Sequence, residues 1–208
     1  VIYNSLVYTG TMVLTRTWYH YDLTTDFDRA VPFVPAWIYV YLVCYIFWIV
    51  NYIMVSRVCD KDRFYRFITA ELIAKTVCLV CYLLLPTTNL RPAVTGDDFA
   101  SLLVKMVYAI DLPSNLFPSI HCLVSWMCWV GIRGNHKVPL AYRLFSLLFA
   151  LAICASTQFT KQHYIADVIG GLAAAEGCWW LAARAGIWMR VQQIFTKINY
   201  RFGRASLE

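Results

Sequence analysis

Three short polar segments hold residues whose types and spacing suit phosphate chemistry, at positions 90–92, 117–121 and 156–167. In the third segment His163 and Asp167 stand four residues apart, which places both side chains on one face of a helix. A carboxylate there can accept the Nδ1 proton of His163, so that Nε2 is free to attack an electrophile. The structural alternative is an interfacial histidine beside a helix-capping aspartate.

His121 stands at the start of another apolar segment. Histidine is the commonest general acid, so His121 is the candidate to protonate a leaving alkoxide. Ser119 can cap the helix that follows, and the free N–H groups of a helix N-terminus bind phosphate readily. A plain helix start at Pro118 and Ser119 is the structural alternative, and it is compatible with the functional one.

Two cations accompany these histidines. A phosphoryl group in transfer carries negative charge on three oxygens, and the fixed charges of Arg91 and Lys161 could stabilise it. The structural alternative is a long side chain that reaches from the membrane to water. For Lys105 and Arg29 we favour that alternative.

The composition places these segments in a membrane protein. Of the 208 residues, 60% are hydrophobic and only 14% are charged, whereas about a quarter of the residues of a soluble domain are charged. A soluble enzyme is therefore excluded. The net charge of +6 comes from short loops between apolar segments, so it indicates membrane orientation and no nucleic-acid partner.

Six apolar segments could cross a bilayer, which takes about 20 helical residues. The first and the fourth are short. Inside the long polar segment 87–118, residues 99–110 predict a short interfacial helix, and residues 16–29 should also lie at the interface. We expect a single all-α membrane domain over residues 1–208, with six transmembrane helices at about 2–14, 34–56, 67–85, 119–132, 144–159 and 163–188.

The loops divide the basic residues unevenly. Segments 57–66 and 133–143 and the tail after residue 188 hold most of the Lys and Arg residues, which marks them as cytoplasmic. The segments at 90–92, 117–121 and 156–167 then share the opposite side. We expect a multi-pass protein of the cell membrane with its active site on the outer, periplasmic face.

Some reactive side chains lie inside the predicted spans. Glu71 and Lys75 are spaced to pair, and we expect a structural role for them. For Glu176 we favour a buried hydrogen bond across helices. Cys78 and Cys81 form a CxxC pair, but no second ligand pair accompanies it, so we expect no metal or redox site there.

Together the three segments resemble the pattern of the type 2 phosphatidic acid phosphatase superfamily of membrane phosphatases and phosphotransferases. That pattern is Lys-x6-Arg-Pro, then Pro-Ser-Gly-His, then Ser-Arg-x5-His-x3-Asp. The order and the internal spacing of the blocks are kept, within residues 66–188 or so. The matching residues are Arg91-Pro92, Pro118-Ser119-Ile120-His121 and Ser156-Thr157-x5-His163-x3-Asp167.

Three positions depart from this pattern: Leu84 replaces the Lys, Ile120 the Gly and Thr157 the Arg. Two cationic phosphate ligands are thus absent, and Lys161 is the candidate to replace one of them. The strings FPSIH and KQHYIAD resemble the branch that includes the fungal inositol phosphorylceramide synthases and many bacterial relatives.

The resemblance implies a six-helix fold, a phosphohistidine intermediate and no metal or other cofactor. In this scheme His163 is the nucleophile, Asp167 holds its ring, and His121 is the general acid. The residues expected to bind the substrate phosphate are Arg91, Lys161, Ser119 and Ser156.

We therefore expect a membrane lipid phosphatase that hydrolyses a lipid phosphate monoester or pyrophosphate. A lipid phosphotransferase, such as a head-group synthase that transfers inositol phosphate to a lipid alcohol, shares the first step and stays open as an alternative. A helical transporter is the non-enzymatic alternative, but the sequence has neither the internal repeats nor the broken spans typical of that class. The expected partners are the lipid phosphate substrate and the bilayer.

Overall fold

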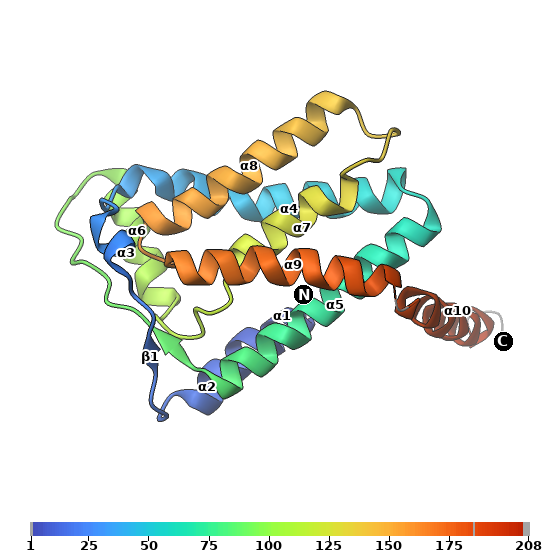
Figure 1. The fold of residues 1–208 in the computed structure, drawn as a ribbon, viewed down its shortest axis with the longest axis horizontal. Helices are drawn as coiled ribbons and strands as arrows, with labels where there is room; N and C mark the ends of the chain where they lie inside the picture. Colours follow the sequence, from blue (N-terminus) through green and yellow to red (C-terminus); the bar gives the residue numbers. More distant parts are fainter. Residues whose placement is uncertain (1, 185, 206–208) are drawn as a thin grey trace.

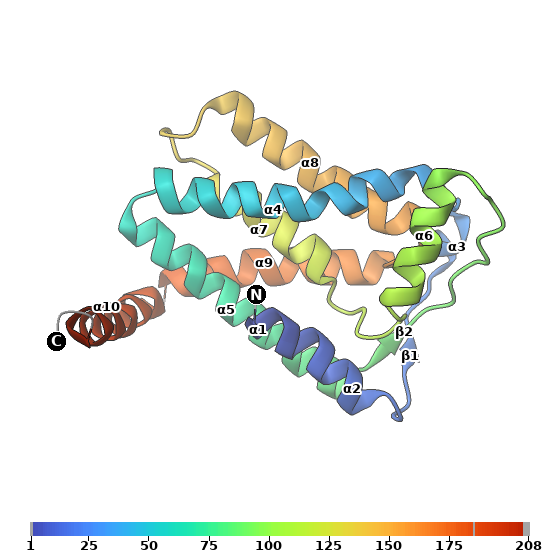
Figure 2. The same ribbon diagram turned by 180° about the vertical axis from the view of Figure 1, so that it is seen from behind.

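The long helices run side by side along the length of the molecule, around a shorter central helix (Figures 1 and 2). The computed structural model describes residues 2–184 and 186–205. The central helix is α7 (Ile120–Ile132), and it packs against all four helices around it. These are α4 (Ile38–Val58), α5 (Lys61–Leu84), α8 (Leu140–Phe159) and α9 (Ile165–Arg184).

α7 lies at the centre because its side chains are apolar or small over its whole circumference. Its fully buried residues include Leu123, Met127 and Ile132. Its neighbour α9 approaches it closely through a glycine: a Cβ atom on Gly171 would lie 2.7 Å from the carbonyl oxygen of Ser119. The two helices therefore touch backbone to backbone at the start of α7.

Four helices are long and apolar enough to cross a membrane, namely Pro35–Val58, α5, α8 and α9. This confirms that the chain is an all-α protein of the membrane class, with a single pair of two-residue strands in its described part. The expected count of six spans is not confirmed. α7 has 13 residues, and the first predicted span consists of three consecutive short pieces beside α5, namely α1 (Ile2–Ser5), η1 (Leu6–Gly10) and α2 (Thr11–Thr15).

Between α2 and α4 the chain crosses one end of the bundle (Figure 1). Strand β1 (Tyr21–Asp22) pairs in parallel with β2 (Thr87–Thr88), which follows α5. Helix α3 (Asp26–Ala30) comes next, and the short turn η2 (Pro35–Trp37) leads into α4. The N-terminal segment is thereby tied to the loop that carries Arg91.

Asp28 shows why this crossing segment lies against the bundle. We expected residues 16–29 at the interface, but Asp28 is only 1% exposed. One carboxylate oxygen completes a capping box with Thr25, and the other accepts a hydrogen bond of 2.7 Å from the Ile165 amide. A carboxylate satisfied in this way can be buried at little cost, and here it caps the start of α9.

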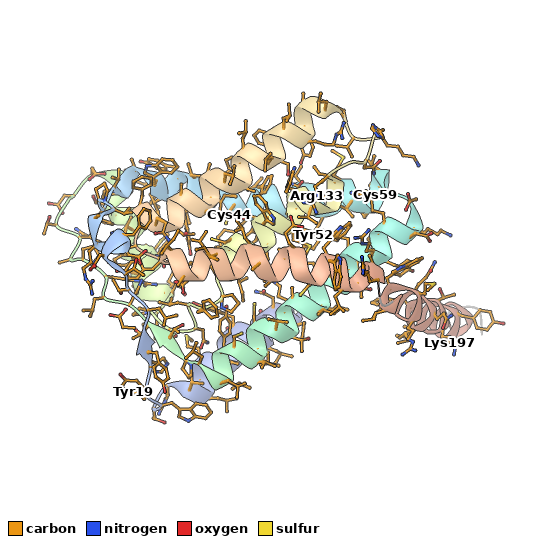
Figure 3. All side chains as sticks on the ribbon, viewed as in Figure 1. Tyr19, Cys44, Tyr52, Cys59, Arg133 and Lys197 are labelled. Atoms are coloured by element: carbon orange, nitrogen blue, oxygen red, sulfur yellow. The ribbon has the colours of Figure 1, made fainter. Side chains whose placement is uncertain are left out.

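The two ends of the bundle differ in their content. Helix α6 (Phe99–Ile110), capped by Asp98, lies at the end that also holds β1 and β2 (Figure 2). The opposite end holds residues 59–60 and 133–139 and leads to α10 (Ile187–Ala205). In Figure 3, Cys59 and Arg133 lie together toward α10, while Tyr19 lies at the far end. The basic loops thus gather at one end of the molecule.

The C-terminal part corrects one prediction. We expected a sixth span up to residue 188 and then a basic tail, but α9 ends at Arg184 and α10 begins at Ile187. Gly186 between them has a φ of 58°, a left-handed conformation that ends helices and favours glycine. The tail is therefore largely a separate helix.

Charged residues inside the helices are paired as expected. Lys75 Nζ and Glu71 Oε2 lie 4.0 Å apart, and both residues are buried in α5. Glu176 of α9 accepts two hydrogen bonds from Arg133, at 2.7 and 2.8 Å, and one of 3.0 Å from Trp126 Nε1. Glu176 therefore bonds across helices as expected, but the site is half-exposed and not buried, since 39% of the Glu176 side chain is accessible.

Candidate active site

The turn between α8 and α9 holds His163 in a fixed position. The carbonyl oxygen of Thr157 accepts hydrogen bonds from the amides of Gln162 (2.9 Å) and His163 (3.1 Å). The side-chain amide of Gln158 donates to the carbonyl oxygen of His163 at 3.0 Å. The turn closes because Lys161 adopts a left-handed conformation with a φ of 54°. The backbone before α9 is therefore almost fully hydrogen-bonded within a few residues.

His163 and Asp167 lie together, as their spacing predicts. His163 Nδ1 is 3.6 Å from Asp167 Oδ2, an ion-pair distance longer than a hydrogen bond. The same carboxylate oxygen accepts the Tyr164 amide at 2.9 Å, so Asp167 also caps the start of α9. Burial lowers the pKa of His163, but the neighbouring carboxylate of Asp167 outweighs this effect and raises the pKa above its usual value.

His121 faces His163 from the start of α7. The two imidazole rings are 5.7 Å apart, centre to centre. Tyr45 of α4 contacts His121 through its hydroxyl, which lies 3.2 Å from Nε2. Tyr41, one helical turn earlier, packs its ring 4.7 Å from the imidazole. α4 thus fixes the orientation of His121.

Arg91 is held beside the same turn. Its guanidinium donates to Gln162 Oε1 at 2.7 Å and to the carbonyl oxygen of Asp111. It also lies 4.7 Å from the ring centre of Tyr108. Arg91 is therefore attached to the residue directly before His163.

Three further hydrogen bonds join separate segments to the turn. Asn89 donates from its side-chain amide to the carbonyl oxygen of Lys161 at 3.1 Å. The Tyr164 hydroxyl donates to the carbonyl oxygen of Leu90 at 2.9 Å. The Tyr108 hydroxyl of α6 donates to the carbonyl oxygen of Thr160 at 2.8 Å. The loop after α5, helix α6 and the start of α9 thus form one hydrogen-bonded unit.

Ser119 caps α7, as its position predicts. Its Oγ accepts the amide of Cys122 at 3.2 Å, and its own amide donates to the carbonyl oxygen of Asp167 at 3.0 Å. The second bond joins the beginning of α7 to the beginning of α9. The blocks that contain His121 and His163 are therefore linked through their backbones.

Lys161 and Ser156 are not brought to the histidines. Lys161 Nζ donates to the carbonyl oxygens of Asp28 (2.7 Å) and Val31 (2.5 Å). The Ser156 hydroxyl donates to the carbonyl oxygen of Ile153 within α8. The left-handed turn directs Lys161 toward the segment before α4. In this structure, then, Arg91 is the predicted phosphate-binding cation that lies near His163.

A cavity of about 490 Å³ lies in front of the two histidines. It is bounded by the N-terminal helical segment and by α4, α5, α6 and α7. Most of its lining is aromatic or aliphatic, and the lining residues with polar groups include Tyr8, Tyr41, Tyr45, Tyr82, Asp111, His121 and His163. Its size suits the head of a lipid.

The sequence did not reveal several of these contacts. Tyr45, Gln162 and Tyr108 were not predicted, although Gln162 directly precedes His163. Tyr45 lies 76 residues from His121, and nothing in a single sequence connects such distant positions. Among the described residues, no group of three or more His, Cys, Asp or Glu side chains is arranged to hold a metal ion.

Comparison with known proteins gives one positive result. Curated proteins gave no match, and solved structures gave none. The sequence model described as PAP2 superfamily matches residues 20–181. The match includes all three segments of the site and the helices that position them. This chain, with both histidines facing one cavity, therefore belongs to the PAP2 superfamily, whose members are in general phosphatases and phosphotransferases.

Proposed function

We propose that this protein is a membrane lipid phosphatase that acts through a phosphohistidine at His163. The observation that carries the proposal is the pair of histidines on one cavity of about 490 Å³, with ring centres 5.7 Å apart. Asp167 lies beside the first histidine, and Arg91 is attached to the preceding residue. Such a nucleophile with an orienting carboxylate and a separate acid is the general arrangement for covalent catalysis.

The reaction proceeds in two displacements. In the first, Nε2 of His163 attacks phosphorus, the bond to the ester oxygen breaks, and His121 gives its proton to the departing lipid alkoxide. In the second, His121 takes a proton from water as the water oxygen attacks phosphorus. The phosphorus–nitrogen bond then breaks, and inorganic phosphate leaves with His163 restored.

Asp167 and Tyr45 position the two imidazoles for these steps. Asp167 stabilises the Nδ1–H form of His163, so that Nε2 keeps its lone pair. The hydroxyl of Tyr45 lies against Nε2 of His121. Proton exchange with the substrate then uses Nδ1 of His121, or Nε2 once the substrate has displaced the tyrosine. Each histidine therefore has its own orienting partner.

Arg91 is the cation attached most closely to the His163 turn; it does not line the cavity, and it would have to leave Gln162 or the Asp111 carbonyl oxygen to reach the phosphate. The free N–H groups at the start of α7, next to Ser119, are the other candidates because a helix N-terminus carries partial positive charge. Lys161 and Ser156, also proposed as ligands, would have to leave their present carbonyl partners to reach the substrate.

We place the active site at the outer face of the cell membrane. We place α7 and the N-terminal segment 2–15 in the bilayer with the four longer helices, which makes six membrane segments, and α6 at the interface. The basic end, with residues 57–66 and 133–143 and α10, then faces the cytoplasm. Arg91, His121 and His163 face the outside, and no metal takes part.

A phosphotransferase is the alternative that shares the first displacement. In that case a lipid alcohol or a polyol replaces water in the second step, as in the inositol phosphorylceramide synthase branch that the sequence resembles. The two activities differ in the acceptor alone. We favour water because hydrolysis needs no second organic substrate in the cavity.

The test is an assay of purified protein in detergent with a panel of lipid phosphates. Phosphate release is measured in EDTA, with and without inositol or diacylglycerol as acceptor. Hydrolysis predicts free phosphate from at least one lipid regardless of acceptor. A strict need for an acceptor would assign the phosphotransferase, and dependence on a divalent metal would contradict the proposed chemistry.

His163→Ala should lower phosphate release by at least about 10³-fold, because no phosphoenzyme can form without the nucleophile. The matched control is His136→Ala, since His136 is an exposed histidine in the loop at the opposite end. The control should keep wild-type activity. Near-normal turnover by a folded His163→Ala protein would exclude this nucleophile.

A further inference from the structure

Asp111 lies in the cavity and has no role in the reaction proposed above. It follows α6, and its carboxylate accepts a hydrogen bond from the hydroxyl of Tyr8. Within residues 2–184 and 186–205 it forms no salt bridge. Arg91 contacts the backbone oxygen of Asp111. The negatively charged side chain of Asp111 therefore lines the cavity that is proposed to bind a negatively charged phosphate.

The charge of the cavity lining is unusual for a phosphate site. Among the described residues, the lining contains no Lys and no Arg, and Asp111 is its one acidic residue. A carboxylate repels a phosphate dianion strongly where water is excluded. Asp111 would thus weaken the binding of a simple phosphate monoester unless the substrate brings a positive charge of its own.

Aromatic rings line the same cavity as the carboxylate. Tyr8, Tyr41, Tyr45, Trp48 and Tyr82 all line the cavity, and the rings of Tyr8 and Tyr82 lie 6.4 Å apart in an edge-on arrangement. The faces of such rings attract cations, and a group of several rings is the usual receptor for an ammonium group. An acidic side chain among them adds a direct ionic partner.

A polyol head would need a different lining. Each hydroxyl requires a hydrogen-bonding partner when it leaves water. Two of the cavity phenols are already engaged, since Tyr8 donates to Asp111 and Tyr82 donates to the carbonyl oxygen of Pro118 at 2.9 Å. Of the other lining residues, Asn4 and Thr9 carry polar side chains, and Asn4 Oδ1 is a buried acceptor without a partner among the described residues, which an ammonium group could satisfy. Met12, Leu42, Val107 and Ile110 are among the apolar ones. The lining therefore favours an ammonium group over a sugar-like head.

We propose that the preferred substrate is a lipid phosphate that carries a protonated amine close to the phosphate. This inference rests on the proposed function and narrows its substrate class. The phosphate would lie against His163, with Arg91 released from Gln162 to meet it, and the amine would lie against Asp111 and the aromatic rings. The negative charge of Asp111 would then help to bind and orient the substrate.

A matched pair of substrates tests the proposal. Sphingosine-1-phosphate carries the free amine, and its N-acetyl derivative has the same phosphate and chain with an uncharged amide. The wild-type protein should hydrolyse the free amine with a kcat/KM at least about tenfold higher, the usual effect of a hydrogen bond to a charged group. Asp111→Asn should remove most of that ratio.

The control variant is Asp97→Asn, which removes an exposed carboxylate paired with Lys105 outside the cavity. It should keep the wild-type ratio. If Asp111→Asn fails to fold, product inhibition of the wild-type protein still tests the preference for a protonated amine. Sphingosine should then inhibit at least about tenfold more strongly than N-acetylsphingosine.

The outcomes separate the two proposals. Equal hydrolysis of both lipids, with equal inhibition by both products, would overturn the amine preference and leave the phosphatase in place. A preference that survives Asp111→Asn would overturn the role of Asp111. No phosphate release from these or any other lipid phosphate in the panel would overturn the phosphatase, and the substrate proposal with it.

Discussion

In the proposed mechanism the imidazole of His163 must be neutral to attack phosphorus, yet the neighbouring Asp167 favours the charged form. Asp167 raises the pKa of His163 despite the opposing effect of burial. The attacking form therefore accumulates only as the pH rises through that raised pKa. The raised pKa also means that protonated His163 stabilises the folded protein. This stabilisation is complete below the pKa of an unfolded histidine and is lost as the pH rises through the pKa of the folded protein.

Asp167→Asn should shift this balance. Without the carboxylate charge the pKa of His163 falls, so the acidic limb of the kcat/KM profile should move to lower pH. The plateau should also fall, by about 10²-fold or more, because the ring loses its orienting partner. The test is to measure kcat/KM of both proteins from pH 4 to 9. If the acidic limb of Asp167→Asn coincides with that of the wild type, a group other than His163 titrates there.

Spacing sufficed to predict which residues pair near His163. The i, i+4 relation of His163 and Asp167 and the capping role of Ser119 follow from helix geometry alone, and both are present. The direction of Lys161 could not be predicted in the same way. It depends on a left-handed turn and on two carbonyl oxygens about 130 residues earlier in the chain.

Lys161→Met separates its two possible roles. The structure predicts that the change leaves the carbonyl oxygens of Asp28 and Val31 without a partner and costs roughly 1–3 kcal/mol of stability. The Tm in detergent should fall, with little change in KM at a temperature where the protein is folded. A raised KM at an unchanged Tm would instead make Lys161 a phosphate ligand.

At the scale of helices, the contact between α7 and α9 decides whether the two histidines meet. The amide of Ser119 bonds to the carbonyl oxygen of Asp167, and Gly171 leaves room for this approach. In Gly171→Ala the added Cβ would lie 2.7 Å from a backbone oxygen. The helices would have to move apart, at a cost of about 1–3 kcal/mol.

The matched control lies on the same helix. Gly177→Ala meets nothing within 4 Å, and alanine should stabilise the helix by about 0.5–1 kcal/mol. Thermal unfolding and phosphate release together give the test: Gly171→Ala should lower both the Tm and the activity, and Gly177→Ala neither. Equal behaviour of the two variants would contradict the close packing.

Apolar periodicity predicted most of the helices but not how they are arranged. Long apolar runs predicted α4, α8 and α9 to within four residues at each end, α5 begins six residues before its predicted start, and α6 matches the predicted range 99–110. The short strands β1 and β2 have no apolar pattern to predict them. The burial of Asp28 was missed because it depends on an amide of α9, far along the chain.

For the whole molecule, the testable question is which end faces outward. Thr95→Cys is a suitable probe, because Thr95 is exposed in the loop before α6. Gly96 beside it is unsuitable, since an added Cβ would lie 2.4 Å from Ser101 Oγ. An impermeant thiol reagent applied to intact cells should label Thr95→Cys and leave native Cys59 unlabelled until the membrane is permeabilised.

A Cys59→Ser background removes the half-exposed native thiol of the basic end and serves as the control. Labelling of Cys59 from outside, with Thr95→Cys protected, would place the histidines at the cytoplasmic surface. The proposed orientation would then be reversed, and so would the leaflet that supplies the substrate.

In the proposed membrane arrangement, the short length of α7 determines how deep the site lies. Its 13 residues rise about 20 Å, whereas the hydrocarbon layer is about 30 Å thick. Its far end is held at the basic end of the bundle, where Arg63 bonds to the carbonyl oxygens of Gly131 and Arg133. If α7 is anchored there, His121 lies well below the opposite surface. A lipid phosphate would reach that depth with its tails still in the bilayer, whereas a soluble phosphate ester would have to enter from water without any such anchor.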